Sequence, residues 1–196
     1  MKRPPAELLL SAYAQGIFPM AHPECDDDVY WYAPDPRAII PLEGFHASRR
    51  LRQQVRRGTY DVRIDTAFER VMEECAAPRD VQKTTWISSG LIDAYTELHR
   101  YGFAHSVEAW VGEELVGGLY GVSLGGLFAG ESMFSKRPNA SKICLVHLVR
   151  HMEASGFSLL DIQFMTDHLA TFGAVEIPRE EYERRLALAL QDECVF

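Results

Sequence analysis

Cysteine is scarce in this sequence, and long apolar runs are absent. The four cysteines, Cys25, Cys75, Cys144 and Cys194, are scattered along 196 residues without paired spacing. This argues against a disulfide framework and against a zinc site. No run is long enough for a membrane-spanning helix, and residues 1–5 lack the apolar core of a signal peptide. We therefore expect a reduced cytoplasmic protein with no membrane partner.

Common catalytic sets are also missing. No Ser-His-Asp or Cys-His arrangement stands out, and no glycine loop of the nucleotide-binding kinds occurs. His147 and His151 are four residues apart, a spacing that metal ligands on a helix can have. No nearby acid or cysteine completes such a site, however, and Arg150 lies between them. We expect no metal ion and no other cofactor.

What the sequence does contain is an ordinary globular composition with interspersed helix and strand patterns. Its length suits one domain with a small appendage. Helices are predicted at residues 6–13, 46–57, 66–75, 89–100, 141–154, 168–172 and 179–190. Strands are predicted at residues 38–41, 60–64, 104–110, 114–122, 127–132, 158–164 and 174–177. This mixture indicates an α+β (mixed α/β) fold.

The most informative segment is glycine-rich and spans residues 115–142. Gly125 and Gly126 separate two apolar runs and predict a β-hairpin turn. The second run leads to Glu131, a carboxylate among small and apolar residues, and Asn139 is placed to cap the next helix. Glycine inside strands usually reflects the close approach of a ligand or another backbone. The segment is either a hairpin packed on a helix or one side of a ligand pocket, and its glycines favour the pocket.

Asp161 and Gln163 form a second polar feature, near the end of the predicted strand 158–164. Residues two apart on a strand point to the same face. Because burying an unpaired polar group is costly, these two side chains belong either to a structural network or to a functional site. With Glu131 on a neighbouring strand they would make a polar cluster in an apolar cleft.

Charge is distributed unevenly. The net charge of −8 argues against nonspecific nucleic-acid binding. Between Glu43 and Asp61, however, there is no acid, and five arginines crowd the segment: Arg49, Arg50, Arg52, Arg56 and Arg57. Helical spacing places Arg49, Arg52 and Arg56 on one face. This face is either a solvated helix surface or a phosphate-contacting patch, and the lack of compensating acids favours phosphate.

Ordered motifs along most of the chain, from about Leu8 to Arg179, carry a family resemblance. They lie at residues 13–19, 33–37, 46–49, 85–87, 105–108, 115–121, 130–135 and 139–142, and at Asp161 with Gln163. On these motifs the chain resembles the leucyl/phenylalanyl-tRNA–protein transferases. The resemblance implies a C-terminal domain at residues 35–196, similar to the acyl-CoA N-acyltransferase (GNAT-like) fold, behind a small, shortened N-terminal lobe at residues 1–34.

The resemblance also implies a reaction. The α-amine of a protein with N-terminal Arg or Lys attacks the ester of Leu-tRNA or Phe-tRNA, which tags that protein for degradation. An aminoacyl ester is already activated, so the reaction needs no ATP, metal or acyl-CoA. The expected partners are therefore aminoacyl-tRNA and acceptor proteins with a basic N-terminal residue, and we expect a monomer.

Roles for single residues follow from the same resemblance. The expected catalytic pair is Gln163, which orients the attacking amine, and Asp161, which polarises Gln163. Trp86 would stack on the terminal adenosine, and Glu131 would bind ribose hydroxyls or the acceptor's ammonium. The donor side chain would enter an apolar pocket of Phe128, Met133 and Leu145, although each of these alone is as readily explained as core. The full expected substrate-binding set is Trp86, Tyr95, Phe128, Glu131, Ser132, Met133, Asn139, Ser141 and Leu145, and the expected tRNA-binding set is the five arginines.

The chain also departs from the family's pattern, and two other functions compete. Met20 stands where members often have Trp, and Ile162 where they often have Cys. An acyl-CoA N-acyltransferase of similar fold would usually offer CoA a glycine-rich loop after its central strand, whereas residues 135–139 contain no glycine. A noncatalytic tRNA-binding module would keep the arginine face without needing Asp161 and Gln163.

Overall fold

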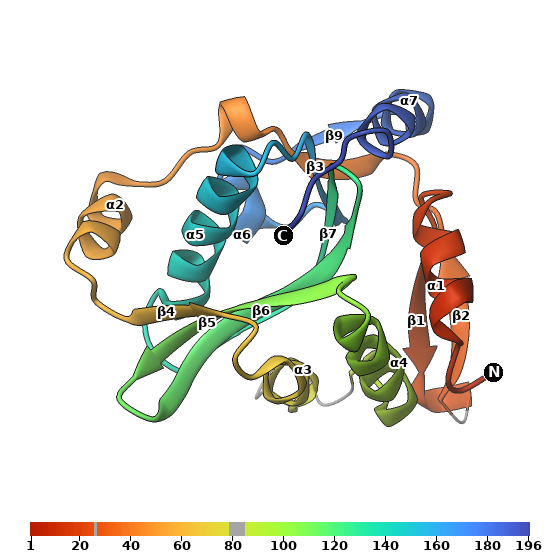
Figure 1. The fold of residues 1–196 in the computed structure, drawn as a ribbon, viewed down its shortest axis with the longest axis horizontal. Helices are drawn as coiled ribbons and strands as arrows, with labels where there is room; N and C mark the ends of the chain where they lie inside the picture. Colours follow the sequence, from red (N-terminus) through yellow and green to blue (C-terminus); the bar gives the residue numbers. More distant parts are fainter. Residues whose placement is uncertain (26, 79–84) are drawn as a thin grey trace.

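The computed structural model describes residues 1–25, 27–78 and 85–196. Within these ranges the chain forms a mixed α+β structure, as predicted, in which a seven-stranded sheet is accompanied by a two-stranded hairpin (Figure 1). The α-helices are α1 (Ala6–Tyr13), α2 (Arg49–Arg56), α3 (Phe68–Ala76), α4 (Ser89–Arg100), α5 (Ala140–Ala154), α6 (Asp167–Ala170) and α7 (Arg179–Ala189). No helix in the described ranges is long and apolar enough to cross a bilayer.

The large sheet has the strand order β4-β5-β6-β7-β8-β3-β9. Its strands are β3 (Arg37–Ile40), β4 (Asp61–Ile64), β5 (Ala104–Val111), β6 (Glu114–Leu124), β7 (Leu127–Ser135), β8 (Leu159–Gln163) and β9 (Val175–Ile177). Every neighbouring pair is antiparallel except β7 and β8, which are parallel and joined through α5. The predicted strands are thus confirmed, with β7 three residues longer than expected.

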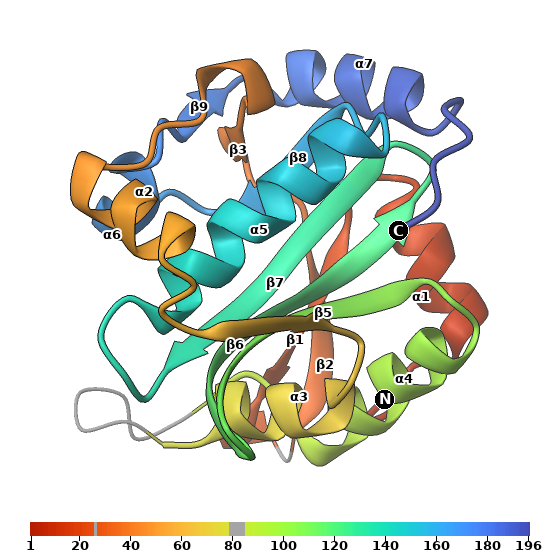
Figure 2. The same ribbon diagram turned by 60° about the vertical axis from the view of Figure 1, so that its left-hand side comes forward.

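Helices cover both faces of this sheet (Figures 1 and 2). On one face α5 packs on β5 and β6, with α2 against α5. On the other face lie α3 and α4, and α1 packs against α4. The N-terminal segment therefore shares its hydrophobic core with the sheet, and its division from the rest at residue 34 stays a prediction.

Sequence patterns missed the N-terminal hairpin of β1 (Phe18–His22) and β2 (Asp28–Tyr32). Pro19 and Pro23 interrupt any alternation there. Proline removes a backbone donor but is tolerated in an edge strand. The two strands of this small sheet are both edges, so the prolines are compatible with the hairpin.

Two helix starts show how local sequence sets the ends of helices. Ser48 caps α2, because its Oγ accepts the Leu51 N–H at 3.2 Å.

Asn139 precedes α5 as predicted, but its side chain does not cap this helix. Its amide instead donates to Gln54 Oε1 at 3.0 Å, and Ser135 Oγ accepts the Ser141 N–H at 3.2 Å. The predicted capping role of Asn139 is therefore wrong, and Ser135 performs it.

The Gly125-Gly126 turn between β6 and β7 is confirmed, but most glycines of this hairpin serve packing. A Cβ on Gly117 would lie 2.4 Å from the Ala140 Cβ, so this glycine lets the start of α5 approach the sheet. A Cβ on Gly121 would lie 2.3 Å from the Ala129 carbonyl oxygen. The expectation that these glycines make room for a ligand is wrong at both positions.

Candidate functional site

A cavity of about 300 Å³ lies where β7 and β8 part. The two strands pair only as far as Ala129 and Asp161, although β7 continues to Ser135. Most of its lining is apolar and includes Met133, Leu145, Leu148, Leu160, Ile162 and Leu169. Phe18, Met20 and Trp86 also line it, as do the polar residues Glu131, Ser132, Gln163, Thr166 and His168. An apolar hollow with few polar groups is typical of a small-molecule site.

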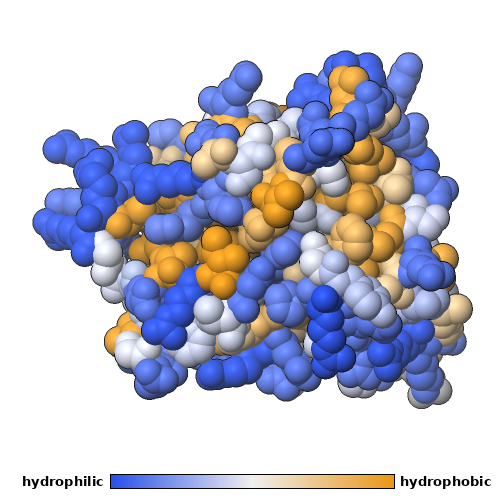
Figure 3. Space-filling view, in the orientation of Figure 1, coloured by the Kyte–Doolittle hydropathy of each residue, from blue (hydrophilic) through white to orange (hydrophobic). Residues whose placement is uncertain are grey.

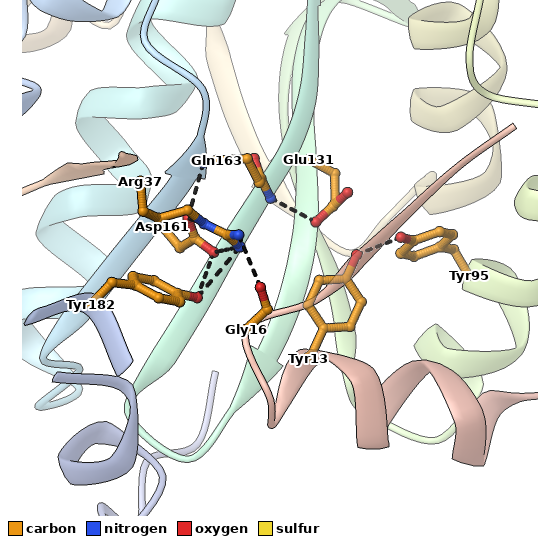
Figure 4. A network of polar contacts seen from close by, with 8 residues as sticks. All are labelled: Tyr13, Gly16, Arg37, Tyr95, Glu131, Asp161, Gln163 and Tyr182. Carbon is orange, nitrogen blue, oxygen red and sulfur yellow. Dashed lines mark hydrogen bonds and ion pairs between the residues drawn. The ribbon is translucent and has the colours of Figure 1, made fainter. Parts of the chain in front are cut away.

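Two polar side chains meet at this cavity. Gln163 Nε2 donates to Glu131 Oε1 at 2.9 Å, from β8 to β7 (Figure 4). Since the amide nitrogen is used, its oxygen is left as the acceptor that Gln163 can offer to a ligand. The predicted polar cluster of Glu131, Asp161 and Gln163 in an apolar cleft is therefore confirmed for Glu131 and Gln163, whereas Asp161 does not line the cavity.

Asp161 lies behind this pair and is fully buried. Arg37 contacts it bidentately, from Nε to Oδ1 at 2.9 Å and from Nη2 to Oδ2 at 2.6 Å. The Tyr182 hydroxyl donates to Oδ2 at 2.9 Å, and the Gln163 backbone N–H donates to Oδ1 at 2.9 Å. Arg37 also donates to the Gly16 carbonyl oxygen at 2.9 Å, as Figure 4 shows. Both carboxylate oxygens of Asp161 are thus occupied within the protein.

The link between Asp161 and Gln163 runs through the backbone. Gln163 has a φ of +58°, in the left-handed region that non-glycine residues rarely adopt. Its N–H reaches the Asp161 carboxylate in that conformation. The expectation that regular strand alternation places the two side chains on one face is wrong, because Asp161 faces Arg37 and Tyr182 whereas Gln163 reaches Glu131. Asp161 thus holds the backbone of Gln163 in place.

Burial sets the protonation of Glu131. The pKa of its carboxyl is raised to about 8: desolvation is the largest cause and the nearby Asp161 adds to it, while hydrogen bonding from Tyr13 and Tyr95 and the charge of Arg37 oppose the rise. The Tyr13 and Tyr95 hydroxyls also contact each other. Burial raises the pKa of both tyrosines well above its ordinary value, so they stay neutral. Glu131 is therefore mostly protonated at neutral pH and ionises within the range where catalytic acids and bases act.

Sequence comparison identifies the family. The profile described as leucyl/phenylalanyl-tRNA protein transferase matches residues 39–187, and that of the family's N-terminal domain matches residues 4–35. The chain belongs to this family. The resemblance drawn from the sequence motifs is therefore confirmed.

Relatives of the transferase family match over nearly the whole chain. A leucyl/phenylalanyl-tRNA–protein transferase of Herpetosiphon aurantiacus is 57% identical over 196 residues, which is 100% of this chain and 99% of that protein. One from Phenylobacterium zucineum is 57% identical over 93% of this chain and 82% of that protein. Among solved structures, L-PGS from Bacillus licheniformis has 18% identity and a TM-score of 0.44, over 84% of this chain and 61% of that one. A likeness this loose carries no argument.

The predicted substrate-binding residues divide into two groups. Trp86, Glu131, Ser132, Met133 and Leu145 line the cavity. The Trp86 segment is held beside the hairpin, because its carbonyl oxygen accepts the Ala21 N–H at 3.0 Å.

The other predicted residues lie outside the cavity. Phe128 is fully buried in the core beside α5, and Tyr95 is fully buried and bonded to Tyr13. Asn139 and Ser141 lie at the start of α5, away from the cavity lining. The expectation that Phe128 and Tyr95 contact the cavity is therefore wrong, because core packing covers both side chains.

The five arginines all lie on or beside α2 and are exposed, while Leu51 and Val55 face the core. Figure 3 shows hydrophilic side chains gathered at the left-hand end, where α2 lies in Figure 1. The predicted exposed cationic face is therefore confirmed, and its contact with tRNA stays a prediction.

Sequence reasoning missed three residues that support the site: Arg37, Tyr182 and Tyr13. Arg37 is buried between two rings, with its Cζ 4.9 Å from the Phe18 ring centroid and 4.5 Å from that of Tyr182. A signal was present, because an arginine directly before the apolar run Ala38–Ile40 needs a buried partner. Nothing in the sequence indicated that the Tyr182 hydroxyl would donate a hydrogen bond to Asp161.

Proposed function

We propose that this transferase moves Leu or Phe from aminoacyl-tRNA to the α-amine of proteins that begin with Arg or Lys. The observation that carries the proposal is the Glu131–Gln163 pair beside an apolar cavity, in a chain of this family. The apolar part of the cavity suits a Leu or Phe side chain, and the polar pair suits an amine attacking the adjoining ester.

The donor side chain occupies the part of the cavity lined by Met133, Leu145 and Leu148 in this proposal. Methionine is flexible and polarisable, so Met133 can pack against side chains of either shape. Trp86, at another part of the same cavity, offers a ring on which the terminal adenosine stacks.

Aminolysis requires a free amine held against the ester carbonyl. Glu131 accepts a proton from the acceptor's ammonium, and Gln163 Oε1 accepts a hydrogen bond from the amine and orients it. The amine nitrogen then forms a bond to the carbonyl carbon and loses a proton, the bond to the ribose oxygen breaks, and that oxygen takes up the proton lost by the nitrogen, while Glu131 releases to solvent the proton it took from the ammonium. A base whose pKa lies near the working pH is the effective kind, which fits the raised pKa of Glu131. Asp161 is a positioning residue that acts through the Gln163 backbone.

The exposed arginines of α2 contact phosphates of the tRNA in this proposal. Arg forms bidentate hydrogen bonds to phosphate, and the segment has no acid to compete. The likeness of residues 35–196 to the GNAT fold is part of the proposal, and the mixed sheet with helices on both faces is compatible with it. The monomeric state and the cytoplasmic location are proposed with it.

A transfer assay tests the function. The protein is incubated with labelled Leu-tRNA or Phe-tRNA and a peptide that begins with Arg or Lys, and we expect label on the peptide. Label that stays on the tRNA with every peptide would contradict the proposal. Calorimetric titration with CoA separates the rival acyl-CoA enzyme, for which tight CoA binding is expected.

A further inference from the structure

One face of the β1–β2 hairpin continues the cavity outward. Phe18 and Met20 both line the cavity, and their register partners are Tyr32 and Tyr30. Directly opposed residues of an antiparallel pair share a face, as do residues two apart. His22 and its register partner Asp28 therefore join these four residues on what we call the hairpin face: Phe18, Met20, His22, Asp28, Tyr30 and Tyr32.

The rings of this face contact one another in a row. Phe18 stacks with Tyr32 at 6.1 Å between centroids, and His22 stacks with Tyr32 at 6.0 Å. His22 also meets Tyr30 edge to face at 4.8 Å, and its Nε2 contacts the Tyr32 hydroxyl. Tyr30 remains 47% exposed. A row of rings that begins at the cavity and ends in solvent offers π-faces to a ligand.

Charge decides which ligand fits these rings. The hairpin sequence, residues 18–32, carries four acids and no Lys or Arg. Of its acids, Glu24 and Asp27 are exposed at the hairpin turn. Aromatic rings accept both nucleotide bases and cations. The Met1 ammonium donates to Asp28 at 2.5 Å, and the charge of Lys2 also acts on this carboxylate. The four acids still outnumber these two cations, and an excess of acids repels RNA phosphates and attracts cations, whereas the arginines of α2 have the opposite preference.

We propose that the hairpin face binds the cationic side chain of the acceptor's N-terminal residue. This inference rests on the proposed function, because it takes the acceptor amine to lie at Glu131 and Gln163. The guanidinium or ammonium group lies over the rings of Tyr30 and Tyr32, with the acidic turn beyond them. Since Met20 lines the cavity and pairs directly with Tyr30, the hairpin face runs from the cavity, where the reacting amine lies, to the rings that hold the cation. The hairpin face thus selects Arg or Lys over neutral residues.

The test compares peptides that begin with Arg and with citrulline, its neutral analogue of the same shape. Wild-type protein should prefer Arg. Tyr30→Ala should raise KM for the Arg peptide about 3- to 30-fold, the range expected for a cation–π contact. Tyr30→Ala should leave KM for the citrulline peptide and KM for Phe-tRNA within about twofold of the wild-type values. Tyr30→Phe should keep the preference for Arg over citrulline, because the cation–π contact needs only the ring.

Trp31→Ala is the matched control, because Trp31 is also partly exposed but alternation places it on the opposite face of β2. A rise in KM for Phe-tRNA with the Arg preference intact would overturn the inference and assign the rings to the nucleic acid. An unchanged preference in Tyr30→Ala would overturn it too. Failure of wild-type protein to modify the Arg peptide would instead refute the proposed acceptor.

Discussion

Gln163 donates to Glu131 across the gap where β7 and β8 part, with 2.9 Å between Nε2 and Oε1. This contact joins two strands that no longer share backbone hydrogen bonds at that level. It places one titratable group and one amide side by side at the cavity.

The first prediction concerns pH. Because burial raises the pKa of Glu131 to about 8, its carboxylate form grows as pH rises towards 8. The acceptor's α-amine loses its proton in a similar range, near pH 7.7 to 8.0 as a rough reference. Transfer needs Glu131 as the carboxylate and the acceptor's amine as the ammonium. The value of kcat/KM for the acceptor therefore rises and then falls with pH, which gives a bell-shaped profile. Initial rates between about pH 6 and pH 9.5, with ester hydrolysis subtracted, measure it.

Glu131→Gln is the control for that profile, since glutamine keeps the size and accepts a hydrogen bond but cannot take up a proton. We expect about 100-fold lower kcat/KM near pH 8 and a rate that rises with pH without a falling limb. His168 also lines the cavity, but burial and the charge of Lys142 lower its pKa, which moves its titration away from that of Glu131. Equal profiles for variant and wild type would refute proton transfer to Glu131.

The second prediction concerns the buried ion pair. Asp161→Asn leaves the Arg37 charge without its counter-ion, which should cost about 3–5 kcal/mol in the free energy of unfolding. The double variant Arg37→Met, Asp161→Leu removes both charges and should unfold at a higher denaturant concentration than Asp161→Asn. It should not recover activity, because a leucine side chain offers the Gln163 N–H no acceptor in place of the carboxylate. Chemical denaturation and the transfer assay measure these two outcomes, and recovery of activity in the double variant would contradict the positioning role.

The third prediction concerns α2. Replacing Arg49, Arg52 and Arg56 by Glu should weaken Phe-tRNA binding and reduce the slope of log K against log salt by about 2 to 3, if each contacts one phosphate. Arg100→Glu is the control, because Arg100 is exposed at the end of α4, on the other face of the sheet. Filter binding at several salt concentrations gives both slopes. An unchanged slope in the triple variant would exclude α2 from the tRNA interface.

The fourth prediction concerns donor size. Leu145 lines the apolar part of the cavity and is 2% exposed. Leu145→Phe should narrow the space and lower kcat/KM for Phe-tRNA roughly tenfold more than for Leu-tRNA. Phe128→Leu is the control, because Phe128 is core and should alter stability without changing the donor ratio. A donor ratio unchanged in Leu145→Phe would place the aminoacyl side chain elsewhere.

Periodicity predicted the helices because most of them bury one face, and burial of one face leaves a regular pattern. The central strands are buried on both faces, and apolar runs bounded by turn residues predicted them. The hairpin of β1 and β2 left no such pattern, since Pro19 and Pro23 interrupt it. The sequence predicted the polar residues of the site, because Glu131, Asp161 and Gln163 are isolated polar residues in otherwise apolar segments. Their connections were not predictable, because Arg37 lies 124 residues before Asp161 and the positive φ of Gln163 arises from tertiary contacts. The aromatic side chain of Phe128 would suit a ligand pocket as well as a core. Only the packing around it shows that it belongs to the core.

The central claim is tested most directly by a single-turnover experiment. It compares wild-type protein with Gln163→Ala in the transfer of Phe from Phe-tRNA to a peptide that begins with Arg. If the Glu131–Gln163 pair is the reaction centre, loss of the orienting amide should slow transfer by about 100-fold or more. The affinity for Phe-tRNA, measured in parallel, should stay within about twofold, since the α2 phosphate contacts are untouched. Transfer at the wild-type rate by Gln163→Ala would contradict the claim.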